Sequence, residues 1–301
     1  MKETISLTFG DQGENHVGMK KHGEIVEKGS GFTYDDLVSI STPFKESGYI
    51  TEMYDLTELY NPPETDKNII LEPAHVCVIR NGLEYILDKH GKTSQELLKE
   101  MLGFEWDKKY YDTRRKRVLN KNARHNVCFD EEQSAPNYET GQGTVISFNS
   151  CPSLNIIREE LMNIHPNKLS GLICEGNRYF DLKKCGIGWH GDAERRKVLA
   201  FRLGESMLLN YNWYYRSKPI GKILSLELNH GDLYIMSEKA VGTDWKLSSK
   251  YTLRHSACVP ESKFMKFKDD TEKQKQKQKQ KQKQKQTAGT TKTVPLPISF
   301  T

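Results

Sequence analysis

The sequence lacks the long apolar runs and the leader pattern of membrane and secreted proteins. No stretch approaches the roughly 20 apolar residues of a membrane span, and the opening Met1-Lys-Glu-Thr-Ile-Ser has no apolar core of a signal peptide. The six cysteines form no C-x-x-C pair and no metal-knuckle spacing, so we expect ordinary thiols in a reducing compartment. We therefore expect an intracellular protein, cytoplasmic or nuclear, with no membrane partner.

The chain also has little net charge outside one low-complexity segment. The formal net charge of +5 includes seven lysines that alternate with glutamine from Lys273 to Gln286, and the rest of the chain carries −2. Because the segment 269–301 has no apolar face to bury, we expect a disordered tail. It is either a weak electrostatic tether to nucleic acid or another polyanion, or a solvated repeat without a role of its own.

The residues before the tail divide into three regions that differ in composition and hydrophobic pattern. An N-terminal extension, 1–67, contains Thr33, a predicted N-cap for a helix with acidic residues in its first turn. A mixed α/β region, 68–150, joins a strand-like run to helical patterns and to a basic, aromatic segment. The region 151–268 begins with a helical pattern and continues with short apolar-rich runs separated by turn residues.

The short runs of the third region predict strands. They cover 172–180, 184–190, 198–203, 207–215, 222–228, 232–237 and 251–258. Many short strands in sequence favour a double-sheet jelly roll, or double-stranded β-helix, which places inward-facing side chains around a pocket. The predicted fold class is therefore α+β, with a jelly-roll core, an N-terminal mixed α/β extension and a disordered C-terminal tail.

The motif His190-Gly191-Asp192 has the spacing of two metal ligands on an extended segment. Residues i and i+2 of a strand point to the same face, so His190 and Asp192 can bind one ion together. A third ligand must come from elsewhere, and only His230 and His255 follow Asp192 in the sequence. His230 lies in a turn-like segment and His255 inside a strand-like run, which favours His255.

Two imidazoles and one carboxylate form the ligand set of a non-haem iron(II) oxygenase. They occupy one face of the metal and leave the other face open for oxygen and substrate. An alternative reading is that these histidines are hydrogen-bonded core or surface residues. The spacing and the strand-like sequence between the two parts favour the metal centre.

A second candidate site is the basic and aromatic segment 106–129. Cations that alternate with aromatic rings can contact phosphates and stack on bases. The other reading, a solvated helix face with core aromatic residues, is equally compatible with the pattern. The candidate substrate-binding residues are Arg114, Arg115, Arg117 and Arg124.

At this point the sequence resembles the AlkB-like branch of the iron(II)/2-oxoglutarate dioxygenases. Asn177-Arg-Tyr179 followed by His190-Gly-Asp192 is similar to the family's N-x-Y and H-x-D segment. The run 228–236, Leu-Asn-His-Gly-Asp-Leu-Tyr-Ile-Met, resembles the strand that leads towards the family's distal histidine. The resemblance covers about 172–258 and rests on the order of these elements. It implies that His190, Asp192 and His255 bind Fe(II).

The resemblance also implies how the cosubstrate binds. Asn177 and Tyr179 would hydrogen-bond 2-oxoglutarate. The family holds the distal carboxylate with an arginine after the distal histidine, but this chain has no arginine beyond Arg254. A cation is needed because that carboxylate would otherwise be buried unpaired. Lys263 and Lys266 are the first candidates, and Arg254 is the alternative.

The resemblance implies an enzyme that uses Fe(II), 2-oxoglutarate and O2 to hydroxylate or demethylate a nucleobase in nucleic acid. The base would be single-stranded or flipped into the pocket. Two alternatives stay open. One is a protein or small-molecule hydroxylase of the same superfamily, which the near-neutral folded part favours. The other is a non-catalytic module that keeps the fold, which the missing distal arginine favours. No protein partner can be inferred.

Overall fold

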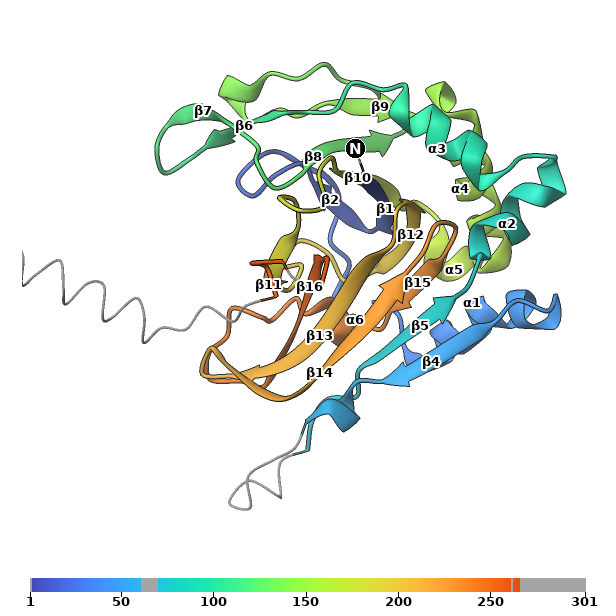
Figure 1. Cartoon of the computed structure of the whole chain (residues 1–301), viewed down its shortest axis with the longest axis vertical. Coiled ribbons are helices and arrows are strands. Elements are labelled where there is room, and N and C mark those ends of the chain that lie inside the picture. The colour runs from blue at the N-terminus through green and yellow to red at the C-terminus, as the bar shows by residue number, and fades with distance from the viewer. Residues whose placement is uncertain (1, 61–69, 261, 266–301) are drawn as a thin grey trace, which may run out of the picture. The chain divides into compact units, whose positions relative to one another are not determined.

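The computed structural model describes residues 2–60, 70–260 and 262–265. These residues belong to one compact unit, Met1–Met265, a sheet-rich mixture of strands and helices (Figure 1). The boundaries expected at 67 and 150 both fall inside this unit. The lysine-glutamine tail and Lys266 lie outside the described residues.

Strands and helices alternate along the first half of the chain. The elements are β1 (Thr4–Gly10), β2 (Gln12–Glu14), β3 (Lys21–Gly23), α1 (Tyr34–Glu46), β4 (Thr51–Asp55), β5 (His75–Ile79), α2 (Gly82–Leu87), α3 (Ser94–Leu102), β6 (Lys109–Asp112), β7 (Arg117–Asn120), β8 (His125–Asp130) and β9 (Val145–Ser147). Thr33 caps α1 as predicted, because its hydroxyl accepts from the Asp36 amide while the Asp36 carboxylate accepts from the Thr33 amide. The basic, aromatic segment forms strands β6, β7 and β8 rather than a helix.

The second half is mainly β structure, as the short apolar runs predict. It contains α4 (Pro152–Ile164), α5 (Pro166–Leu169), β10 (Ile173–Tyr179), β11 (Ile187–His190), β12 (Val198–Gly204), β13 (Met207–Tyr215), β14 (Lys218–Leu228), β15 (Leu233–Met236), α6 (Glu238–Val241) and β16 (Thr252–Cys258). β14 begins before the predicted residue 222, because it pairs with β13 as far as the tight turn at Arg216 and Ser217. Among the described residues, no helix is long and apolar enough to cross a membrane.

Two sheets form the centre of the unit. The larger is 8-stranded, with the order β4-β5-β15-β12-β1-β10-β8-β9, and the smaller is 4-stranded, with the order β11-β16-β13-β14. β1 lies between β10 and β12 and pairs antiparallel with both. The N-terminal strand is therefore central to the sheet that the later strands build.

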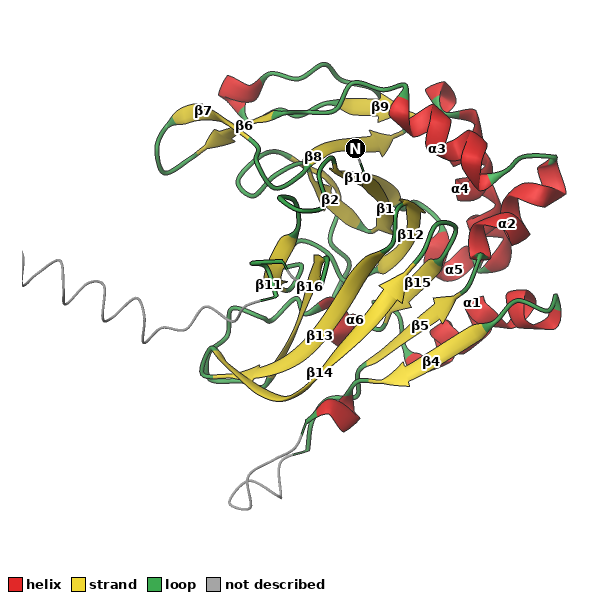
Figure 2. Cartoon of the chain, in the orientation of Figure 1, coloured by secondary structure: helices red, strands yellow, loops and turns green. Residues whose placement is uncertain are grey.

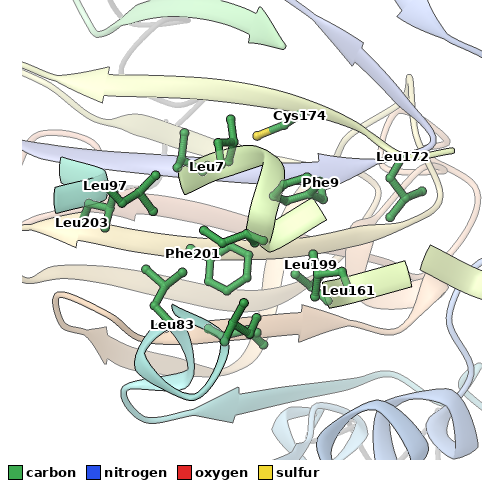
Figure 3. Close-up of a cluster of buried hydrophobic side chains, with 14 of the residues drawn as sticks. Leu7, Phe9, Leu83, Leu97, Leu161, Leu172, Cys174, Leu199, Phe201 and Leu203 are labelled. Atoms are coloured by element: carbon green, nitrogen blue, oxygen red, sulfur yellow. The ribbon is translucent and has the colours of Figure 1, made fainter. Parts of the chain in front are cut away.

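Successive side chains of the central strands point to opposite faces of the larger sheet, and the two faces have different surroundings. Leu199, Phe201 and Leu203 of β12 pack in a core cluster with β1 and helices α1–α4 (Figure 3). Val198 and Ala200 of the same strand pack in a second cluster with residues of the smaller sheet. The helices α1–α5 gather on one side of the strands (Figure 2). The opposite face of the larger sheet is thus left to the smaller sheet and to a cavity between their side chains.

Candidate metal centre

Strands β11 and β16 bring the three predicted ligands together. The two strands are antiparallel neighbours, and His190 lies directly opposite His255 in their register. Asp192 follows two residues after His190, and its amide donates to the Val241 carbonyl at 3.0 Å. His255 lies inside β16 as expected, whereas β11 ends at His190, so Asp192 lies just beyond the strand rather than within it.

The ligand atoms of His190, Asp192 and His255 all lie within 4.8 Å of one another. Asp192 Oδ1 is 3.5 Å from His190 Nε2 and 3.6 Å from His255 Nε2. Atoms bound at about 2.1 Å to one ion, at right angles, would be about 3 Å apart. The three side chains therefore fit a single first-row metal ion after a small contraction.

Hydrogen bonds orient the His190 ring for metal binding. Its Nδ1 atom lies 2.7 Å from the Gly188 carbonyl and 3.1 Å from the His255 carbonyl. A carbonyl can only accept, so Nδ1 carries the proton and the lone pair of Nε2 points towards Asp192. This is the arrangement that usually fixes a metal-binding histidine.

Arg195 holds the carboxylate of the cluster. Its side chain, 4% exposed, lies 3.4 Å from Asp192 and 2.9 Å from Glu194, and it also pairs with Glu175. Burial opposes ionisation of Asp192, but Arg195 and the two histidines outweigh it, so the pKa of Asp192 lies well below its ordinary value. Burial and the neighbouring His190 lower the pKa of His255, although Asp192 acts in the opposite direction. Both shifts favour the forms in which these groups bind a divalent metal, an anionic carboxylate and a neutral imidazole.

The cluster opens into a cavity of about 490 Å³. The cavity is lined by side chains from both sheets and from the segment after β2. They include Ser6, Thr8, His16, Arg124, Glu175, Asn177, Tyr179, Arg195, Arg202, Tyr234, Trp245 and the three candidate ligands. Its size lies in the range of small-molecule and cofactor sites.

Comparison with known proteins finds a viral relative. The chain is 42% identical over 259 residues to the protein named Uncharacterized protein R156 from Acanthamoeba polyphaga mimivirus, a match that spans 85% of this chain and 96% of R156. The chain belongs to the R156 family. No model of a known protein family matches the sequence.

In this member of the R156 family, the predicted cosubstrate residues Asn177 and Tyr179 both line the cavity. The Asn177 amide is already engaged: its Oδ1 accepts from Arg124 Nε at 2.6 Å and from Asn126 Nδ2 at 2.5 Å, and its Nδ2 donates to Glu175 at 3.0 Å. One amide hydrogen of Asn177 is therefore left for a ligand. Tyr179 is 4% exposed, and burial raises the pKa of its phenol.

Neither Arg254 nor Lys263, two of the three cations expected for the distal carboxylate, lines the cavity. Arg254 stacks on Tyr214, with its guanidinium carbon 4.1 Å from the ring centre, and donates to the Trp245 carbonyl at 3.2 Å. Lys263 lies over the ring of Phe264. Stacking on aromatic rings holds both cations outside the cavity, and Lys266 is not among the described residues.

A cation that the sequence reasoning missed lines the cavity instead. Arg202, in the middle of β12, is only 1% exposed. The signal in the sequence is a single charge inside the apolar run Val198-Leu-Ala-Phe-Arg-Leu-Gly, because a charge is rarely buried there without a function or a partner. The role of Arg202 depends on the strands that pair with β12, and the local sequence pattern does not predict that pairing.

The remaining candidates lie in two places. Arg124 lines the cavity, whereas Arg114, Arg115 and Arg117 are exposed where β6 turns into β7.

His230, the alternative to His255 as the third metal ligand, does not line the cavity. Its Nδ1 accepts from the Gly204 amide at 2.9 Å, and its Nε2 lies 2.7 Å from Ser94 Oγ. His230 therefore has a structural role at the end of β12.

Proposed function

We propose that this member of the R156 family is an Fe(II)- and 2-oxoglutarate-dependent dioxygenase of the AlkB-like type that oxidises a nucleobase in nucleic acid. The observation that carries the proposal is the cluster of His190, Asp192 and His255 at the wall of a polar cavity. Two imidazoles and one carboxylate leave coordination positions free for a cosubstrate and for oxygen. A structural zinc site would instead close its coordination with a fourth protein ligand, and no fourth residue joins this cluster in the described part of the chain.

The strand order supports a jelly-roll core. The central part of the larger sheet runs β10-β1-β12-β15, and the smaller sheet runs β11-β16-β13-β14. This order matches that of an eight-stranded jelly roll if β1 takes the place of a strand after β16, and we propose that architecture for the core. In such a barrel the cavity lies between the two sheets, and here the ligands come from the end of β11, from the residues just after it and from the middle of the neighbouring β16.

The position of β1 accounts for the absence of an arginine after His255. In the family that the sequence resembles, the arginine after the distal histidine would belong to the strand that follows. Here β1 occupies that place and presents Ser6 and Thr8 to the cavity. A cation for the cosubstrate must then come from another strand.

The residues of the cavity have distinct tasks in the proposed reaction. When bound, Fe(II) would supply oxygen activation coupled to decarboxylation of 2-oxoglutarate. Arg195 fixes the Asp192 carboxylate, and the two carbonyls fix the His190 tautomer. Arg124 and Asn126 donate to the Asn177 side-chain oxygen and so fix the orientation of this amide in the cavity wall. Preorganised donors of this kind orient a ligand without a further cost at the moment of reaction.

The substrate assignment rests on the turn between β6 and β7. Arg114, Arg115 and Arg117 are exposed there. The hairpin contacts the segment that lines the cavity, because Tyr110 of β6 stacks on His16 with ring centres 3.8 Å apart. A nucleic-acid strand whose phosphates bind the turn would thus have bases close to the cavity.

We expect the chain, loaded with Fe(II) and 2-oxoglutarate, to remove N-methyl groups from a single-stranded oligonucleotide. Replacing Arg114, Arg115 and Arg117 together with alanine should weaken binding of that strand and reduce its salt dependence, by roughly 0.7 in the logarithmic slope per lost phosphate contact. Filter binding over a salt series, with mass spectrometry of the bases, measures both effects.

A matched control removes the same number of charges on another hairpin. Arg216, Lys218 and Lys222 are exposed on the turn and strand that follow β13, and none of them lines the cavity. The triple alanine variant at these positions should bind the oligonucleotide like the unchanged chain. Equal losses in both triple variants, or no loss in either, would remove the support for nucleic acid as the substrate and favour a protein or small molecule.

A further inference from the structure

Arg202 is a buried cation without a counter-charge. Its side chain is 1% exposed, its Nε has no hydrogen-bond partner, and its Nη1 reaches only the Met207 sulfur at 3.9 Å. Within the described part of the chain, no carboxylate pairs with it. A guanidinium is always charged at physiological pH, and burying one unpaired is strongly unfavourable. A ligand in the cavity that brings an anion would remove this penalty.

The other two arginines of the cavity wall differ from Arg202. Arg195 is neutralised by Glu175, Glu194 and Asp192. Arg124 donates its Nε hydrogen to Asn177. Of the three, Arg202 is the one whose side chain is almost fully buried with neither a carboxylate partner nor a side-chain hydrogen bond to an oxygen among the described residues.

The register of the larger sheet surrounds Arg202 with neutral hydrogen-bonding groups. Arg202 lies opposite Ser6 of β1, and Ser6 lies opposite Asn177 of β10, so the three form one row across neighbouring strands. Ser6 Oγ is 3.5 Å from the Tyr234 hydroxyl. Arg202 is also close enough to Tyr179 to lower the pKa of its phenol, although burial, the larger effect, raises it. Hydroxyl donors beside a guanidinium are the usual surroundings of a bound carboxylate.

We infer that Arg202 binds a carboxylate in the cavity, and that this carboxylate is the distal one of 2-oxoglutarate. The second part rests on the proposed function. The guanidinium and the neighbouring hydroxyls would hold one end of the dicarboxylate, and the histidine cluster, which lines the same cavity from the other sheet, would be left for its 2-oxo acid end. Arg202 is thus the residue that selects a 2-oxo acid with a second carboxylate over one without it.

The test begins with glutarate, which has both carboxylates but no 2-oxo group to chelate a metal. Calorimetry on the metal-free chain should show that glutarate binds at least about tenfold more tightly than glutaramide, its uncharged diamide, which has no carboxylate. Arg202→Met should abolish this preference, and Arg202→Lys should restore part of it. As a control, Arg178→Met removes a β10 arginine that pairs with Glu3 and does not line the cavity, and it should leave glutarate binding unchanged.

The outcomes separate this inference from the proposed function. If glutarate binding depends on Arg202 but the unchanged chain shows no turnover, the carboxylate site stands and the dioxygenase proposal fails. If turnover occurs and Arg202→Met keeps the KM for 2-oxoglutarate, the inference is overturned and the function stands. Loss of inorganic phosphate binding in Arg202→Met, with glutarate binding intact, would assign Arg202 to a substrate phosphate and overturn the inference as well. Equal binding of glutarate and glutaramide to the unchanged chain overturns it without any variant.

Discussion

The Asp192→Ala variant is expected to bind Fe(II) at least about 100-fold more weakly than the unchanged chain, and to lose all metal-dependent activity. Asp192 supplies the anionic ligand of the cluster, and Oδ1 lies within 3.6 Å of both histidine Nε2 atoms. Two neutral imidazoles alone cannot balance the charge of a divalent ion. Anaerobic titration with Fe(II), followed by metal analysis after desalting, measures the change.

The fold should survive the loss of Asp192. Arg195 keeps Glu175 and Glu194 as partners in the variant, so no buried charge is left isolated. His230→Gln is the matched control, because it removes a histidine near the end of β12 that bonds to Ser94 and to the Gly204 amide rather than to the cluster. Full metal binding by Asp192→Ala, or equal losses in both variants, would contradict the assignment of the metal centre.

The Gly191→Ala variant is expected to disrupt the same centre without removing a ligand. A Cβ at Gly191 would lie 2.1 Å from the Gly242 carbonyl oxygen and 2.9 Å from Trp245 Cβ. The first contact is with backbone, so the H-x-D segment itself must move. We expect a loss of about 1–3 kcal/mol in the free energy of unfolding and at least about tenfold weaker Fe(II) binding, because His190 and Asp192 flank the displaced residue.

Gly188→Ala provides the matched control on the same strand. A Cβ at Gly188 would meet only Phe264 Cδ1, at 3.9 Å, which is an ordinary van der Waals distance. This variant should keep the stability and the metal affinity of the unchanged chain. Thermal unfolding and Fe(II) titration compare the stability and the metal affinity of the two glycine variants. Equal stability and equal metal affinity would show that close packing at Gly191 does not position the ligands.

Local sequence patterns predict much of this site. The spacing of one residue in an extended segment predicts that His190 and Asp192 lie close together. The structure brings the two side chains together at the end of β11, with Asp192 just beyond the strand. The choice of His255 over His230 also follows, because His255 lies inside an apolar strand pattern and His230 in a turn. The helix that begins after Thr33 follows from its capping residues.

The remainder of the site depends on long-range pairing that local patterns do not encode. Nothing in the run Thr4–Gly10 indicates that it pairs with both β10 and β12. That pairing places Ser6 between Asn177 and Arg202 and lets one cavity wall combine residues from both ends of the chain. For this reason the cation was sought after His255, among Arg254, Lys263 and Lys266, whereas the structure offers Arg202 on β12.

The most direct test of the proposed chemistry is the conversion of 2-oxoglutarate by the unchanged chain. We expect succinate and carbon dioxide in equal amounts, formed only when Fe(II) and oxygen are both present and increased by a methylated single-stranded oligonucleotide. The Asp192→Ala protein in the same assay should form neither product. Absence of succinate from the unchanged chain with Fe(II) bound, or succinate formation that persists in Asp192→Ala, would contradict the proposed dioxygenase.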